Sequence, residues 1–178
     1  MAMDAQTMQK ALAALDGKVP EPLQLLIGGG AAFILAHHIP LSTFDIDGIP
    51  YQSKLTVAEL DPYVKAVAKE LNIPSDWLNP YYGTFTYSLP KDYGKRLVTV
   101  FNGKKIRAVA LGKEDLLIMK CFAGREKDIP HARQLLKKKL NTLLVRDHLH
   151  QCLQEKLPQA QEACDFFYEL CEQLGIEI

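Results

Sequence analysis

Three consecutive glycines between two apolar runs constrain this chain more than any other feature of its sequence. Residues 28–30 follow the run Leu23–Ile27, which has the length of a buried strand, and precede the small apolar residues 31–38. Length and pattern predict a strand, a tight turn and a helix in that order. Such a turn can bind an anion, because glycine permits close approach and the first helical amides point outward at the positive end of the helix dipole. Tight packing alone is the alternative explanation.

A pair of carboxylates follows on the next predicted strand. Residues 43–49 alternate polar with apolar, so Asp45 and Asp47 are expected to project from one face. Two neighbouring anions repel each other, and a hard divalent cation such as Mg²⁺ relieves that repulsion while bridging carboxylates to phosphates. The alternative is a pair of exposed acids at a strand end, since Gly48 and Pro50 follow directly.

Helix and hairpin signals complete the first part of the chain. Apolar residues at helical spacing predict a first helix that ends at Asp16, and Asp61 followed by Pro62 predicts the start of another. Residues 97–101 and 106–110 are predicted to form the two strands of a β-hairpin. Together these elements indicate a small mixed β-sheet flanked by helices.

The remainder of the chain is helical in pattern. Four segments carry this pattern, namely residues 113–124, 129–139, 141–156 and 158–174. We therefore expect an α/β (α+β) fold with two parts. Residues 1–112 form the α/β core domain, and residues 113–178 form a helical C-terminal region packed on that core.

Charge, cysteine content and hydropathy limit the class of protein. The chain has 21 basic and 21 acidic side chains, which argues against binding nucleic acid by broad electrostatics but leaves a local basic patch open. Its four cysteines occur singly, so a zinc site is not expected and a reducing compartment is. No signal-peptide pattern begins the chain, and its apolar runs are far shorter than the ~20 residues that span a bilayer. We expect a cytoplasmic protein with no membrane partner.

The strand, glycine turn, helix and Asp-apolar-Asp strand together resemble the signature of the DNA polymerase β-like nucleotidyltransferase superfamily. The matching stretches are Leu26–Ala32 and Ser42–Asp47. This resemblance implies a two-metal Mg²⁺ site at Asp45 and Asp47, which are then also the catalytic residues. It implies nucleoside triphosphate binding by the residues of the glycine turn and its neighbour, namely Gly28, Gly29, Gly30 and Thr43.

A second block, Gly112–Asp128, is similar to a segment in uncharacterised bacterial members, among them abortive-infection and toxin-type nucleotidyltransferases. The similarity implies that Lys120 and Arg125 face the nucleotide. Lys127 lies about two helical turns beyond Lys120, so a shared helix face is expected, and we include it among the nucleotide-binding candidates. The alternative is ordinary surface cations with acidic neighbours.

The chain departs from this superfamily in two ways: Leu41 stands where many relatives carry a basic residue before the Asp-apolar-Asp strand, and a third carboxylate is not found. Active members usually carry a third carboxylate on a later strand facing the first two, and the predicted strand 97–101 offers only Thr99 as a polar candidate. Two functions therefore stay open. One is transfer of a nucleoside monophosphate to a hydroxyl of RNA, protein or a small molecule, with tRNA, a protein acceptor and an antitoxin-like protein as partners implied by the resemblance. The other is a catalytically degenerate nucleotide-binding or protein-interaction module.

Two further clusters suggest other roles. The histidine pairs His37–His38 and His148–His150 lack the i, i+4 spacing of helical zinc ligands, so a histidine metal site is the weaker hypothesis. An aromatic cluster is predicted to form core or a lid, with stacking on a nucleobase as the alternative. Its members are Trp77, Tyr81, Tyr82, Phe85 and Tyr87.

Overall fold

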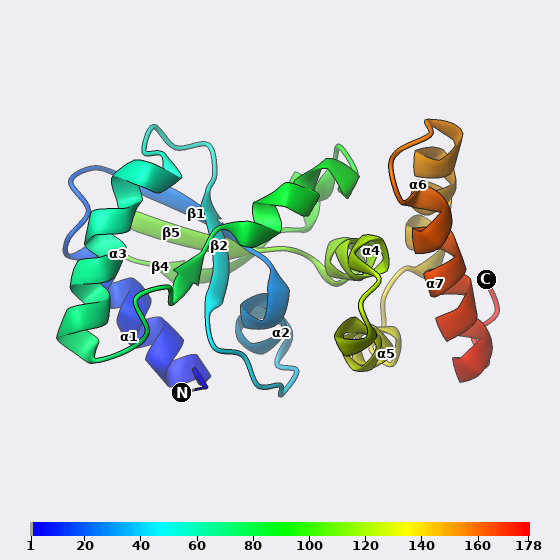
Figure 1. Ribbon diagram of the computed structural model, residues 1–178, viewed down its shortest axis with the longest axis horizontal. Coiled ribbons are helices and arrows are strands. Elements are labelled where there is room, and N and C mark those ends of the chain that lie inside the picture. The colour runs from blue at the N-terminus through cyan, green and yellow to red at the C-terminus, as the bar shows by residue number, and fades with distance from the viewer. Residues whose placement is uncertain (1) are drawn as a thin grey trace. The chain divides into compact units, whose positions relative to one another are not determined.

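The computed structural model describes residues 2–178 and consists of two compact units (Figure 1). The sheet unit comprises Met1–Gly83 and Leu97–Leu111, and the helical unit comprises Thr84–Arg96 and Gly112–Ile178. The expected α/β class, with a mixed sheet, flanking helices and a helical C-terminal half, is confirmed. Residues 84–96, which were expected in the first domain, belong to the helical unit.

One five-stranded mixed sheet forms the centre of the sheet unit, with the strand order β3-β2-β1-β5-β4. β1 lies in the middle, antiparallel to β2 and parallel to β5, while β2 pairs in parallel with β3. β4 pairs antiparallel with β5 at the far edge. The strands are β1 (Leu23–Ile27), β2 (Ile46–Pro50), β3 (Leu78–Asn79), β4 (Val98–Asn102) and β5 (Ile106–Ala110).

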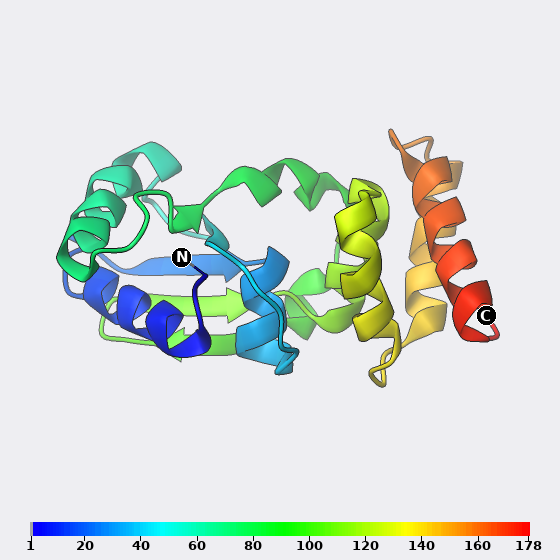
Figure 2. The ribbon, with the colours of Figure 1, turned by 60° about the horizontal axis from the view of Figure 1, so that its bottom comes forward.

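Three α-helices belong to the described part of the sheet unit, namely α1 (Ala5–Asp16), α2 (Gly29–His37) and α3 (Val57–Leu71). α1 packs against α3, and the two helices lie side by side in both ribbon views (Figures 1 and 2). α2 packs against β2, β4 and β5. Because α2 begins only two residues after β1 ends, the chain turns sharply at the end of the central strand.

α3 and β2 begin at residues that differ from those expected. α3 starts at Val57 rather than at Asp61, because Thr56 and Glu59 form a capping box. The Thr56 N–H donates to Glu59 Oε2 at 2.8 Å, and the Glu59 N–H donates to Thr56 Oγ1 at 3.3 Å. Pro62 therefore lies inside the helix. β2 begins at Ile46, so Asp45 lies immediately before the strand.

The helical unit contains the remaining four α-helices of residues 2–178. They are α4 (Lys113–Ala123), α5 (Ile129–Leu136), α6 (Thr142–Gln154) and α7 (Ala160–Leu174). α4 packs against all of the other three, and α6 lies beside α7 (Figures 1 and 2). No helix among the described residues has the length and apolar character needed to cross a membrane.

Residues 84–96 attach to the helical unit through polar and aromatic contacts. Arg96 forms a two-pronged ion pair with Asp115 of α4, with Nε–Oδ2 at 2.9 Å and Nη2–Oδ1 at 2.8 Å. The ring of Tyr87 meets Phe122 edge to face, with centroids 5.9 Å apart. His148 of α6 hydrogen-bonds through Nε2 to the Ser88 carbonyl at 2.7 Å. These contacts explain why the segment belongs with the helices and not with the sheet.

The predicted β4–β5 hairpin is confirmed, and a carboxylate from α1 holds its turn. Asp16 Oδ1 accepts hydrogen bonds from the N–H groups of Lys105 at 2.8 Å and Ile106 at 2.6 Å. Asp16 Oδ2 accepts from Lys104 N–H at 3.0 Å. Gly103 is required beside it, because a Cβ there would lie 2.3 Å from Asp16 Oδ1. Asp16 thus joins the end of α1 to the far edge of the sheet.

We expect Asp16→Asn to lower the free energy of unfolding by about 1–2 kcal/mol at neutral pH, after allowance for partial exposure. Burial raises the pKa of Asp16, but the three N–H donors outweigh burial and leave the pKa below its ordinary value of 3.8. A depressed folded-state pKa stabilises the protein above the unfolded value, and that stabilisation is lost as the pH falls through the folded pKa. The stability gap between the two proteins should therefore narrow below about pH 4 in thermal melts. Asp61→Asn, which removes an exposed acid, should change stability little at any pH.

Candidate functional site

The glycine turn and Asp47 are in direct contact in the structure. Gly29 adopts a left-handed backbone conformation with φ +51°. A Cβ at Gly29 would lie 1.6 Å from Asp47 Oδ2, so the carboxylate rests directly on the bare α-carbon. The Gly28 N–H also donates to the Asp47 carbonyl at 2.9 Å. The start of α2 and the start of β2 are therefore joined by both backbone and side chain.

The other two glycines meet side chains from different parts of the sheet unit. A Cβ at Gly28 would lie 2.7 Å from the ring of Tyr82, whose hydroxyl donates to the Leu26 carbonyl at 2.5 Å. A Cβ at Gly30 would lie 2.9 Å from the Cβ and Oγ1 atoms of Thr43. Each glycine thus admits one neighbour that a larger residue would displace, and tight packing contributes to the need for glycine at all three positions.

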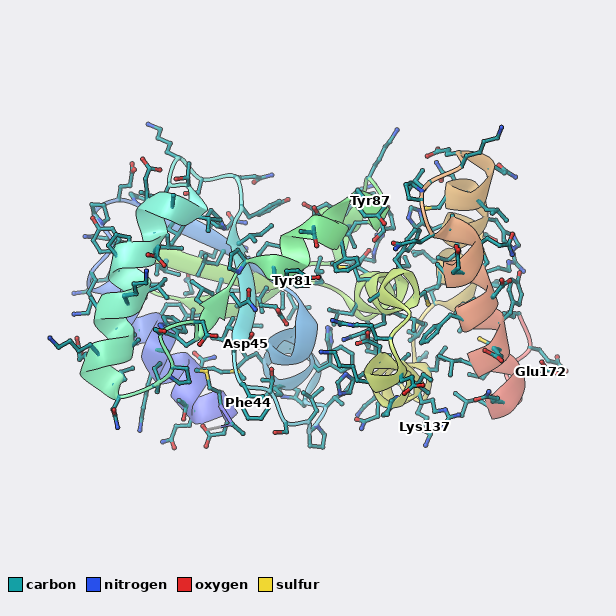
Figure 3. The ribbon with its side chains drawn as sticks, in the orientation of Figure 1. Phe44, Asp45, Tyr81, Tyr87, Lys137 and Glu172 are labelled. Carbon is teal, nitrogen blue, oxygen red and sulfur yellow. The ribbon has the colours of Figure 1, made fainter. Side chains whose placement is uncertain are left out.

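Asp45 lies just before β2 and, like Asp47, is half-buried. Its Oδ2 accepts a hydrogen bond from Asn79 Nδ2 at 2.9 Å. The Thr43 hydroxyl donates weakly to Asp45, with its oxygen 3.3 Å from the backbone carbonyl oxygen and 3.4 Å from Oδ1. Figure 3 labels Asp45 where the chain enters β2, next to the exposed side chain of Phe44.

Asn79 is a site residue that the sequence pattern does not predict. β3, on which it lies, is only two residues long and shows no alternation that would predict a strand. β3 pairs with β2 in parallel, and Asn79 stands opposite Asp47 in the register. The side chain nearest to the carboxylate pair on the neighbouring strand is therefore an amide.

The expectation that strand 97–101 faces the carboxylates is wrong. This segment forms β4, and β1 and β5 separate β4 from β2. Three strand spacings put Thr99 about 14 Å from β2 across the sheet. Among residues 2–178, no group of three or more His, Cys, Asp or Glu side chains could together hold a metal ion. Within the described part of the chain, Asp45 and Asp47 are therefore not joined by a third such side chain.

Lys120 and Arg125 of the helical unit share one buried carboxylate. Lys120 Nζ lies 2.5 Å from Asp128 Oδ1, and Arg125 Nε lies 2.6 Å from Asp128 Oδ2. The Asp128 side chain is 1% exposed. Burial raises the pKa of Asp128, but the two cations lower it by a larger amount and leave it below its ordinary value. The alternative that these cations have acidic neighbours therefore holds for Asp128, which pairs with both. Contact of Lys120 and Arg125 with a nucleotide stays a prediction.

Lys127 does not share a helix with Lys120. α4 ends at Ala123, because Gly124 adopts a left-handed conformation with φ +55°. Lys127 lies on the short 3₁₀ helix Glu126–Asp128 and is exposed. The expected common helix face is therefore wrong, and nucleotide binding by Lys127 stays a prediction without that support.

Several of the histidines and aromatic residues considered as ligands for a metal or a nucleobase make hydrogen bonds within the protein. His37 Nε2 lies 2.9 Å from the Leu111 carbonyl, and His150 Nε2 lies 2.7 Å from the Tyr168 hydroxyl. Trp77 is fully buried, and its indole N–H donates to the Val64 carbonyl at 3.0 Å, as expected of a core residue. Tyr81, by contrast, is 60% exposed.

The carboxylate pair offers the oxygen donors that Mg²⁺ prefers in proteins, beside a helix start that favours anions. No curated protein and no solved structure matches this chain. Residues 6–168, however, match a protein family described as a nucleotidyltransferase of unknown function (DUF6036). Because the match covers most of the chain, the protein belongs to this nucleotidyltransferase family.

Proposed function

We propose that this protein binds a nucleoside triphosphate with Mg²⁺ at the Gly29–Asp47 contact and transfers a nucleoside monophosphate to an acceptor hydroxyl. The observation that carries the proposal is the Asp47 carboxylate resting on Gly29 at the start of α2. Membership of a nucleotidyltransferase family supports a nucleotide as the substrate.

Electrostatics explain why the proposal requires a cation. The amides at the start of α2 attract an anion, but a polyphosphate there would stand beside Asp45 and Asp47 and be repelled. Asp45 and Asp47 would hold a divalent cation, whose charge would offset that repulsion. When bound, Mg²⁺ supplies charge neutralisation at the phosphates and orients them for in-line attack.

In this proposal each residue has a separate task. Asp45 and Asp47 hold the cation, and the N–H groups of Gly29 and Gly30 hold the β- and γ-phosphates. The acceptor hydroxyl attacks the α-phosphorus and loses its proton to water, while the bond from the α-phosphorus to the oxygen bridging to the β-phosphorus breaks and pyrophosphate leaves. Tyr81, whose side chain is exposed, is the aromatic residue near the site that we expect to stack on the nucleobase.

The acceptor is an RNA, a protein side chain or a small molecule. By analogy with toxin-type members, tRNA and protein are the acceptors to test first. The same analogy suggests an antitoxin-like protein as a binding partner.

The binding step is tested by thermal shift with each nucleoside triphosphate, with and without Mg²⁺. A ligand at about 100 times its Kd should stabilise the wild type by about 2.7 kcal/mol, or roughly 5–10 °C. Asp45→Asn and Asp47→Asn should lose this shift, and Asp61→Asn, an exposed acid on α3, should keep it. An unchanged shift in both site variants would show that the site lies elsewhere.

The transfer step is tested with an α-³²P-labelled triphosphate and cellular RNA or protein as acceptor. Asp45→Asn and Asp47→Asn should lower the labelling rate by ~10²–10⁴. Label that appears equally with wild type and both variants would contradict the proposal.

A second candidate function is nucleotide binding without efficient transfer. The amide of Asn79 beside the carboxylate pair favours it, because an amide cannot act as the base that accepts the proton of an attacking hydroxyl. A Mg²⁺-dependent thermal shift without transfer of label to RNA or protein would identify this function.

A further inference from the structure

The orientation of the Asn79 amide is determined by its two partners. The Tyr81 backbone N–H lies 2.9 Å from Asn79 Oδ1, and Asp45 Oδ2 lies 2.9 Å from Asn79 Nδ2. A backbone N–H can only donate, and an ionised carboxylate can only accept. The amide therefore directs its NH₂ group, and not its oxygen, at Asp45.

The three side chains at this site differ in the charge that they offer to cations. Asp45 and Asp47 carry a formal charge of −2, and Asn79 adds none. One divalent cation balances that charge. A second cation next to Asp45 on the β3 side would face the positive end of the NH₂ group and lack an anionic ligand.

We propose that Asn79 is a positioning residue that holds Asp45 by a hydrogen bond and limits this site to one protein-bound divalent cation. The inference rests on the proposed function, in which Asp45 and Asp47 hold the cation. The hydrogen bond to Asp45 takes the place that a second cation would otherwise fill. This arrangement differs from the two-metal site that the sequence resemblance implies.

The test is Asn79→Asp, which keeps the size of the side chain and replaces the NH₂ group by an oxygen. The carboxylate retains the acceptor for the Tyr81 N–H and places a third anion next to Asp45. Titration with Mn²⁺ alone, followed by electron paramagnetic resonance of the free ion, should give one bound Mn²⁺ per wild-type chain and two per Asn79→Asp chain. In chelator the variant should melt below the wild type, and Mg²⁺ should restore its melting temperature.

Two controls separate charge from position. Asn102→Asp adds the same charge at an exposed position of β4, and should bind one Mn²⁺ and melt like the wild type in chelator. Asn79→Ala removes the donor without adding charge. It should still bind one Mn²⁺, with an affinity about tenfold lower, because Asp45 is no longer held.

Two bound Mn²⁺ ions in the wild type, or a single Mn²⁺ and an unchanged melting temperature in Asn79→Asp, would overturn the inference. Failure of the proposed function has a different signature, namely no Mg²⁺-nucleotide shift in the wild type. A wild type that shows the nucleotide shift but binds two Mn²⁺ ions retains the function and loses the role assigned to Asn79.

Discussion

Gly29→Ala is expected to abolish the Mg²⁺-nucleotide shift and to lower the free energy of unfolding by about 2–4 kcal/mol. Two effects contribute to this loss of stability. Alanine at φ +51° carries the cost of a left-handed conformation, about 1–2 kcal/mol. The new Cβ would also lie 1.6 Å from Asp47 Oδ2, so the carboxylate must move away from the start of α2. Urea denaturation and thermal shift with Mg²⁺-nucleotide measure the two consequences separately.

Gly175→Ala is the matched control for this substitution. Gly175 has φ +64° at the end of α7, and no atom lies within 4 Å of its added Cβ. The change should therefore carry only the conformational cost of about 1–2 kcal/mol and leave the nucleotide shift intact.

Combining Gly29→Ala with Asp47→Ala tests the clash directly. The double variant should recover part of the stability, because the carboxylate that collides with the added Cβ is gone. It should still show no nucleotide shift. Equal stability losses in Gly29→Ala and Gly175→Ala would contradict the contact between Gly29 and Asp47.

Asp115→Ala is expected to lower the free energy of unfolding by about 3–5 kcal/mol, as measured by urea denaturation. Asp115 is fully buried and receives both prongs of the Arg96 guanidinium, which is itself only 17% exposed. Removal of the carboxylate leaves a charged group in a poorly solvated place. The guanidinium cannot escape this cost by losing its proton, because an arginine side chain stays protonated in proteins even without its partner.

Asp92→Ala provides the control, because Asp92 pairs with the same arginine at the surface. Its carboxylate lies 3.1 Å from Arg96 Nη1, and its side chain is 51% exposed. A solvated pair of this kind contributes about 0–1 kcal/mol. Similar losses in the two variants would contradict the distinction between the buried and the exposed partner. Replacing both Arg96 and Asp115 by apolar residues should cost less than Asp115→Ala alone.

The sequence predicted those parts of the sheet unit that depend on short-range patterns. The strand Leu23–Ile27 has the bounds expected, and α2 begins in the glycine turn. The hairpin β4–β5 is likewise present. These elements follow from apolar periodicity and from turn-forming residues, and both signals lie within a few residues of the element that they predict.

The start of α3 shows how two local signals compete. Asp61 and Pro62 form a plausible helix start, but Thr56 and Glu59 form one five residues earlier. The earlier start satisfies two backbone amides reciprocally, whereas Pro62 has no N–H to satisfy. The helix therefore begins at the capping box and tolerates proline inside it.

The cations of the second block show a limit of helical spacing. Lys120 and Lys127 are seven residues apart, but Gly124 ends the helix between them. Lys120 then meets Asp128 across the turn that follows the helix. The spacing of seven residues is meaningful only while the helix continues, and a single left-handed glycine removes it.

What the sequence determined by itself is the local chemistry, namely a glycine turn at a helix start and two carboxylates two residues apart. The contact of Asp47 with Gly29 and of Asn79 with Asp45 follows only from the tertiary structure. The same holds for the position of Thr99, which lies on β4, away from β2. The physical reason is that strand pairing joins segments more than thirty residues apart, and β3 has two residues with no periodic pattern. Local patterns specify which face of a strand a side chain occupies, and the order of strands in the sheet specifies which side chains meet.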